Sequence, residues 1–171
     1  MFAIAPGWEE IMRAAELDSF DRLWQLDTDW IEEPNRRRRG WSGVVRRELP
    51  TAEGPMSLFI KRQAGQNRRT PRHPLRGRPT FFREYEFLRR HGARFPQLVG
   101  YACYGETRDG PTDRAVLATF GLTGFRDLDA SAAWGSRRQL KETLAEAAWA
   151  ILPLHRRHLQ HGALYACHIF T

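Results

Sequence analysis

The chain has 171 residues, of which 42% are hydrophobic and 12% aromatic, so it can bury one sizeable core and disorder is not expected. Cys103 and Cys167 are its two cysteines, and their wide separation argues against a disulfide framework or a zinc site and fits a reducing cytoplasm. No run of about 18 uncharged apolar residues occurs, and residues 1–7 are too short for a signal-peptide core, so we expect a soluble chain that is not exported.

The formal net charge of +7 is unevenly distributed. Residues 1–35 contain two basic and nine acidic residues, whereas residues 36–94 contain 17 basic and four acidic ones. Arginine supplies 25 of the 27 basic residues, and it forms planar, two-pronged contacts with phosphate and carboxylate. This indicates a phosphate-rich partner, but a solvated basic face that reflects genome composition explains the same counts equally well.

Two short helices are expected in the first 35 residues. Residues 8–17 place Trp8, Ile11 and Met12 near one helical face, with acidic residues in the first turn where the helix dipole favours them. A second helix is expected after Ser19 and ends before Pro34.

The middle of the chain predicts two strands, a loop and a helix. Residues 40–49 and 57–63 have the pattern of strands separated by a turn. Residues 64–79 are polar and rich in proline, which predicts a loop without regular structure. Thr80 is a plausible N-cap for a helix that ends at His91 and Gly92.

The last part of the chain predicts a hairpin and a long helix. Residues 98–104 and 114–120 read as its two strands, joined by a turn-rich segment. Residues 136–159 have apolar side chains at helical spacing, with Ser136 as N-cap, and Pro153 should kink the helix or end it early. The fold class predicted from these elements is α+β.

Three features in sequence order point to nucleotide chemistry. They are a turn with glycine and serine at Gly40, Ser42 and Gly43, a lone strand lysine at Lys61, and a helix acid at Glu84. A glycine-bearing hairpin lets backbone amides approach phosphates, while a strand lysine neutralises their charge and a helix glutamate orients that lysine. Each feature alone is weak, because a Gly-x-x-Gly turn is usually only a turn and a lone strand lysine is usually a solvated edge residue. Since Lys141 is the only other lysine in an arginine-rich chain, a generic role for Lys61 becomes less probable.

A longer string of motifs runs through nearly the whole chain. Its residues are Arg38-Arg39-Gly40-Trp41-Ser42, Phe59-Ile60-Lys61-Arg62-Gln63, Arg69-Thr70, His73-Pro74, Gly77, Pro79-Thr80-Phe81, Arg83-Glu84, Thr119, Leu122, Gly124-Phe125, Leu128 and the stretch 161–170. This string resembles the InaA-type lipopolysaccharide kinases of the Kdo/WaaP family, within the protein-kinase-like superfamily.

The resemblance implies one partial protein-kinase-like domain. Residues 1–35 would be an N-terminal helical segment, residues 36–122 an N-lobe with an antiparallel sheet and an αC-type helix, and residues 123–171 the first part of a helical C-lobe. It also implies ATP and Mg²⁺ as cofactors and transfer of a phosphoryl group to a sugar of the lipopolysaccharide core, such as a heptose. The expected location is cytoplasmic, with peripheral association at the inner face of the inner membrane.

The sequence departs from the family pattern at the expected catalytic loop. Where related kinases have His-Arg-Asp, this chain has His161-Gly162-Ala163, so the expected base is replaced by alanine. His168 falls where kinases place a metal-binding asparagine, although Mg²⁺ prefers oxygen ligands. Packing and hydrogen bonding explain His161 and His168 as well as a catalytic role does. The chain also ends before an Asp-Phe-Gly-type segment, so we expect a truncated kinase with crippled turnover.

Two functional classes therefore remain open. The favoured one is a sugar kinase whose basic residues 36–94 meet ATP, substrate phosphates or anionic lipid headgroups. The other is a non-catalytic binding module, either similar to a pseudokinase or a basic protein that binds nucleic acid, and the nucleic-acid variant is the less favoured of the two.

Overall fold

The structure is a computed structural model that describes residues 1–37, 40–52, 54–95, 98–108, 112–128, 136–160, 165 and 168–170. The chain divides into two compact units. The first comprises Met1–Ala93 and Val99–Gly121, and the second comprises Arg94–Leu98 and Leu122–Thr171. Each unit is described by itself.

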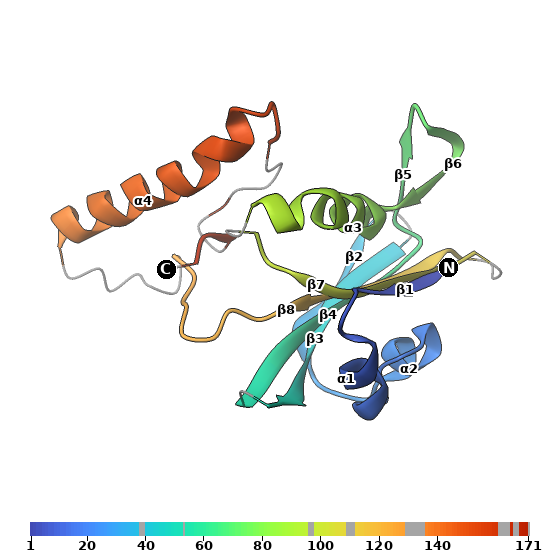
Figure 1. Ribbon diagram of the computed structural model, residues 1–171. Helices are drawn as coiled ribbons and strands as arrows, with labels where there is room; N and C mark the ends of the chain where they lie inside the picture. The colour runs from blue at the N-terminus through green and yellow to red at the C-terminus, as the bar shows by residue number, and fades with distance from the viewer. Residues whose placement is uncertain are drawn as a thin grey trace. The chain divides into compact units, whose positions relative to one another are not determined.

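A six-stranded antiparallel sheet forms the centre of the first unit (Figure 1). Its strand order is β1-β7-β8-β4-β3-β2. The strands are β1 (Phe2–Ile4), β2 (Trp30–Arg37), β3 (Gly40–Thr51), β4 (Gly54–Ala64), β7 (Tyr101–Thr107) and β8 (Arg114–Phe120). The predicted α+β class with an antiparallel sheet is therefore confirmed, as are the strands of the hairpin now seen as β7 and β8.

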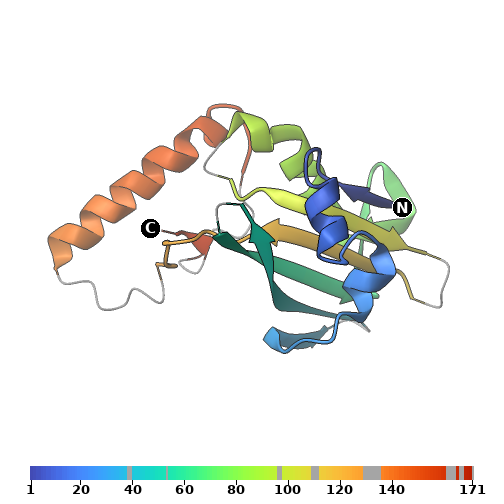
Figure 2. The same ribbon diagram turned by 60° about the horizontal axis from the view of Figure 1, so that its bottom comes forward.

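Two short helices cover one face of this sheet (Figure 2). They are α1 (Glu9–Ala14) and α2 (Phe20–Gln25), both at positions where the sequence predicts helices. The Ser19 hydroxyl accepts a hydrogen bond from the Arg22 amide and so caps α2. Met12 and Leu23 are fully buried, and they belong to the same core cluster as Ile60 of β4.

Helix α3 (Thr80–His91) lies on the opposite face of the sheet (Figure 1). Its Tyr85 ring stacks on Tyr104 of β7, with ring centroids 4.5 Å apart. Side chains alternate along each strand, so Ala115 and Leu117 of β8 join this second cluster while their neighbours join the first. The same alternation in β4 places the Ile60 side chain on the face covered by α1 and α2. The side chain of the next residue, Lys61, lies on the face covered by α3.

The segment predicted as a loop at residues 64–79 contains a two-stranded hairpin, so that prediction was wrong. Its strands are β5 (Asn67–Thr70) and β6 (His73–Pro79). Pro71 begins the tight connection, where its fixed φ suits a turn, and Pro79 closes β6 at its end. Gly77 has φ +71°, and a Cβ there would lie 2.7 Å from the Arg68 carbonyl oxygen, so the hairpin requires glycine at this position.

Strands β1 and β2 were also missed from the sequence. Strand β1 has three residues, too few for a periodic pattern, and it is held by pairing with β7. Strand β2 contains Pro34, which breaks the expected pattern but is tolerated because β2 is the outer strand of the sheet. Its register shifts twice against β3, between Trp30 and Glu32 and between Glu32 and Asn35.

The second unit contains the long helix α4 (Arg137–His155). The predicted N-cap is confirmed, because the Ser136 hydroxyl accepts a hydrogen bond of 3.2 Å from the Gln139 amide. Pro153 lies inside the last turn, and the helix ends two residues later. Within the described part of the chain, no helix is both long and apolar enough to cross a membrane.

Candidate nucleotide-binding site

Lys61 and Glu84 form an ion pair between β4 and α3. The Lys61 Nζ donates a hydrogen bond of 2.5 Å to Glu84 Oε1, although the two residues are 23 positions apart in the sequence. The Lys61 side chain is 28% exposed and that of Glu84 is 38% exposed, so the pair is partly shielded yet reachable from solvent. The structure thus brings together the two residues that the sequence singled out most strongly.

The strand that carries Lys61 is interior to the sheet. Lys61 is opposite Val44 of β3 and Leu117 of β8. The alternative reading of Lys61 as a solvated lysine on an edge strand is therefore wrong. A half-buried ammonium group that is oriented by one carboxylate is suited to neutralise the charge of a bound phosphate.

Gln63 fixes the start of α3 and was missed by the sequence analysis. Its side chain is fully buried, and its Oε1 accepts hydrogen bonds from the Thr80 hydroxyl (2.7 Å) and the Phe81 amide (3.0 Å). The predicted role of Thr80 as N-cap is wrong, because Pro79 occupies that position and Thr80 is the first helical residue. Since Gln63 follows Lys61 by two positions on the same face of β4, one strand holds both the lysine and the helix that carries its partner.

The segment from Gly40 to Gly43 begins strand β3, which confirms the strand predicted at residues 40–49, whereas the turn predicted at Gly40 to Gly43 itself was wrong. Gly40 pairs with Arg37, and residues 38 and 39 between them lie outside the described residues. A Cβ on Gly40 would lie 2.3 Å from the Ala64 carbonyl oxygen, and one on Gly43 would lie 2.8 Å from the Trp30 ring. Close packing therefore accounts for both glycines. Contact of Gly40, Ser42 and Gly43 with phosphates stays a prediction.

Replacing Gly43 by alanine tests whether close packing or phosphate contact requires glycine at this position. Because the added methyl group meets the Trp30 ring, we expect the free energy of unfolding to fall by about 1–3 kcal/mol in urea titrations. Any stabilisation by added ATP should persist, because the methyl group meets the Trp30 ring and leaves the backbone amide of residue 43 in place for a phosphate. Loss of nucleotide binding in a variant of unchanged stability would contradict this assignment.

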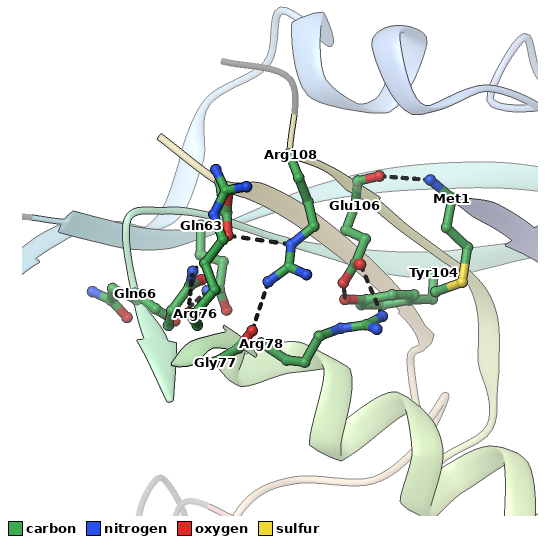
Figure 3. A network of polar contacts seen from close by, with 11 residues as sticks. Met1, Gln63, Gln66, Arg76, Gly77, Arg78, Tyr104, Glu106 and Arg108 are labelled. Carbon is green, nitrogen blue, oxygen red and sulfur yellow. Dashed lines mark hydrogen bonds and ion pairs between the residues drawn. The ribbon is translucent and has the colours of Figure 1, made fainter. Parts of the chain in front are cut away.

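A polar network ties the β5–β6 hairpin to the sheet (Figure 3). Arg78 Nη2 lies 2.8 Å from Glu106 Oε1, and the Tyr104 hydroxyl donates a 2.8 Å hydrogen bond to the other oxygen of that carboxylate. Burial raises the pKa of the Tyr104 phenol, and the hydrogen bond to Glu106 raises it further. Tyr104 therefore stays protonated at neutral pH and acts as a donor.

A second carboxylate joins the same region. Asp113 is buried, and its Oδ2 accepts a 2.6 Å hydrogen bond from the Asn67 side chain and a 3.3 Å bond from Arg108 Nε. Arg108 Nη2 also donates to the Gly77 carbonyl oxygen at 2.6 Å (Figure 3). These contacts hold the hairpin and the start of α3 in fixed positions, and no sequence motif indicated them.

The expected catalytic-loop residues are largely outside the described part of the chain. His161 and Ala163 are among the residues whose structure is not described. His168 belongs to the second unit, is exposed, and donates its backbone N–H to the Tyr165 carbonyl oxygen at 2.9 Å. Catalytic roles for His161 and His168 stay predictions.

The described residues give little support for metal binding or for a reactive thiol. They contain no group of three His, Cys, Asp or Glu side chains that could hold a metal ion. Burial raises the pKa of the Cys103 thiol to about 12, so it remains protonated and unreactive near neutral pH.

A strand lysine paired with a helix glutamate is the arrangement that protein kinases use to hold ATP. Residues 21–171 match the model of the Lipopolysaccharide kinase (Kdo/WaaP) family, and the chain belongs to this family. The resemblance identified in the sequence is therefore confirmed.

Two known proteins are similar to this chain. Protein InaA of Escherichia coli (strain K12) is 31% identical over 170 residues, which cover 92% of this chain and 73% of InaA. A solved structure, WaaP in complex with acyl carrier protein, has 20% sequence identity and a TM-score of 0.49, and the match covers 86% of this chain. The chain spans 53%, about half, of that WaaP chain.

Proposed function

We propose that this chain binds ATP through Lys61 and Glu84 and transfers a phosphoryl group to a sugar hydroxyl of the lipopolysaccharide core. The ion pair of 2.5 Å between these side chains carries the proposal. Membership of a lipopolysaccharide kinase family supports the reaction class and the substrate class.

Lys61 would contact the phosphates of ATP, and Glu84 would keep the ammonium group oriented while the phosphates are absent. Phosphoryl transfer depends mainly on positioning and charge neutralisation. The proposed contribution of this pair is a positive charge that is held in a fixed position at the phosphates. Gly40, Ser42 and Gly43 lie at the start of β3, next to the connection from β2, and are proposed to line the nucleotide phosphates from that side.

Magnesium accompanies ATP in kinases, where it bridges the phosphates and neutralises developing charge. Among the described residues no group of three His, Cys, Asp or Glu side chains could hold the ion, and no ligand is assigned to it. His168 offers nitrogen rather than the oxygen that Mg²⁺ prefers.

We further propose that turnover is slow. Ala163 stands where the family pattern expects an aspartate that accepts the hydroxyl proton. A general base contributes about a hundredfold to ten-thousandfold, so its loss weakens phosphoryl transfer without abolishing it. The acceptor is proposed to be a heptose or another core sugar, met at the inner face of the inner membrane by a chain associated peripherally with anionic lipid.

Transfer of labelled γ-phosphate from ATP to purified lipopolysaccharide core tests this function. We expect labelling that requires Lys61 and proceeds about a hundredfold to ten-thousandfold more slowly than with a family member that has the aspartate. A rate equal to that of such a relative would refute the impaired turnover. Labelling no higher than that of the Lys61→Ala variant would refute the kinase reaction.

The alternative function is a non-catalytic module that binds nucleotide without turning it over, as in a pseudokinase. Alanine at position 163 is the observation that favours it. ATP binding that depends on Lys61, combined with no transfer to any core sugar, would identify this alternative.

A further inference from the structure

A hollow outside the Lys61 site lies between the β5–β6 hairpin and the start of α3. Its volume is about 270 Å³. The residues that line it include Arg68, Arg72, His73, Arg78, Phe82 and Arg83. The hairpin stands beside the first turns of α3 (Figure 1), and residues of both elements line the hollow.

The residues that line this hollow carry a net positive charge. Four of them are arginines, one of which is paired with Glu106, and Glu86 is the one acidic residue among them. Glu86 Oε1 accepts a 2.6 Å hydrogen bond from Arg90, so its charge is already partly neutralised. Among the described residues no carboxylate pairs with Arg68, Arg72 or Arg83. Clustered like charges repel one another, and a bound anion would offset that repulsion.

Two local features fit an anion between these walls. Arg83 is in the first turn of α3, where the helix dipole disfavours a cation and favours an anion, and this turn contains no acidic residue. Arg78 is held in place by Glu106 and lies over the Phe82 ring, 3.7 Å from its centroid. Its buried Nε has no hydrogen-bond partner in the described structure. Arg78 is therefore held in one position where it lines the hollow.

The hollow is separate from the nucleotide site. Neither Lys61 nor Glu84 lines it. Glu84 turns toward β4, whereas its neighbour Arg83 lies on a different side of α3 and lines the hollow. An anion bound here is therefore held by other side chains than those that hold the phosphates of ATP.

We propose that this hollow binds a phosphate monoester carried by the acceptor, which makes the substrate a sugar that already has a phosphate group. Guanidinium groups bind phosphate in two-pronged, charge-assisted contacts, and arginine is the residue that supplies them here. The assignment to the acceptor rests on the proposed kinase function, whereas phosphate binding itself does not.

Calorimetric titration with glucose 1-phosphate, with glucose as the uncharged control, tests the site. We expect the protein to bind glucose 1-phosphate and not glucose. The double variant Arg72→Ala/Arg83→Ala should bind it at least about tenfold more weakly, because each lost charge-assisted contact weakens binding by that order. Both side chains are exposed and form no ion pair among the described residues, so the unfolding midpoint in urea should stay unchanged.

Two control variants locate the binding. Arg89→Ala removes an exposed arginine of α3 that does not line the hollow, and Lys61→Ala disables the nucleotide site, so both should bind glucose 1-phosphate as the parent chain does. Equal affinity in the double variant, or loss of affinity in Lys61→Ala, would overturn the proposal. ATP stabilisation that persists in the double variant would leave the proposed kinase function intact.

A sedimentation assay distinguishes a lipid headgroup from a free sugar phosphate. Phosphatidylcholine vesicles with and without phosphatidic acid are the probes. Binding to phosphatidic acid that is lost in the double variant would identify a phosphorylated lipid, whereas binding of glucose 1-phosphate alone would identify a soluble sugar phosphate. Vesicle binding that is equal in the double variant would contradict the site.

Discussion

Replacing Lys61 by alanine is expected to remove most of the thermal stabilisation that the proposed ATP binding would give this chain. A ligand at about one hundred times its dissociation constant stabilises the folded state by about 2.7 kcal/mol. Removing the ammonium group deletes a charge-assisted contact with the phosphates, worth about 1.5–3 kcal/mol, so most of this stabilisation should disappear. Differential scanning fluorimetry with and without ATP measures the effect.

Lys141 provides a matched control, because it is the only other lysine of the chain. It lies exposed on α4, in the second unit, and Lys141→Ala should keep the full response to ATP. Glu84→Gln should give an intermediate response, since the lysine remains but loses its 2.5 Å partner. Equal stabilisation of the parent chain and the Lys61→Ala variant would contradict the site.

Replacing Glu106 by glutamine is expected to lower the free energy of unfolding by about 3 kcal/mol or more. The Glu106 side chain is 6% exposed and its partner Arg78 is 18% exposed, so the substitution leaves a shielded guanidinium without its counter-charge. Urea unfolding, followed by circular dichroism, measures the change. The hairpin that carries Arg78 should also lose protection from amide hydrogen exchange.

The same substitution at an exposed position controls for the loss of charge alone. Glu48 pairs with Arg46 on the surface of β3, where both side chains are about half exposed. Glu48→Gln should leave the urea midpoint nearly unchanged, because solvent screens exposed pairs. A similar midpoint in the two variants would show that the Glu106 pair behaves as a surface ion pair.

The elements whose apolar residues recur at a regular spacing were predictable from the sequence. Helix α4 with its Ser136 cap and the hairpin of β7 and β8 both follow from spacing and turn residues. The hairpin of β5 and β6 was not predictable, because its stability comes from contacts made far along the chain. Asp113 accepts a hydrogen bond from Asn67 of β5, and Glu106 pairs with Arg78 of β6. The segment also contains prolines, which normally exclude strands, and for this reason its sequence predicted a loop.

In the candidate site, too, some residues could be identified from the sequence and others could not. Lys61 and Glu84 were identifiable because residue type, order and the rarity of lysine all pointed to them. Gln63 carried no such signal, since a buried glutamine gains its meaning from the Thr80 and Phe81 groups that it contacts. Gly40 and Gly43 were taken for a turn because glycine permits both a turn and close packing, and only the position of Trp30 and Ala64 distinguishes the two.

The most direct test of the nucleotide site uses an ATP analogue with an acyl group on its terminal phosphate. A lysine amine near the phosphates attacks the acyl carbon, so an amide bond forms, the acyl–phosphate bond breaks and ATP leaves. With two lysines in the chain, mass spectrometry of the digested protein assigns the label without ambiguity. We predict labelling of Lys61 that excess ATP suppresses, with only background labelling of Lys141. Equal labelling of both lysines, or labelling of Lys61 that ATP does not suppress, would contradict a phosphate-binding role for Lys61.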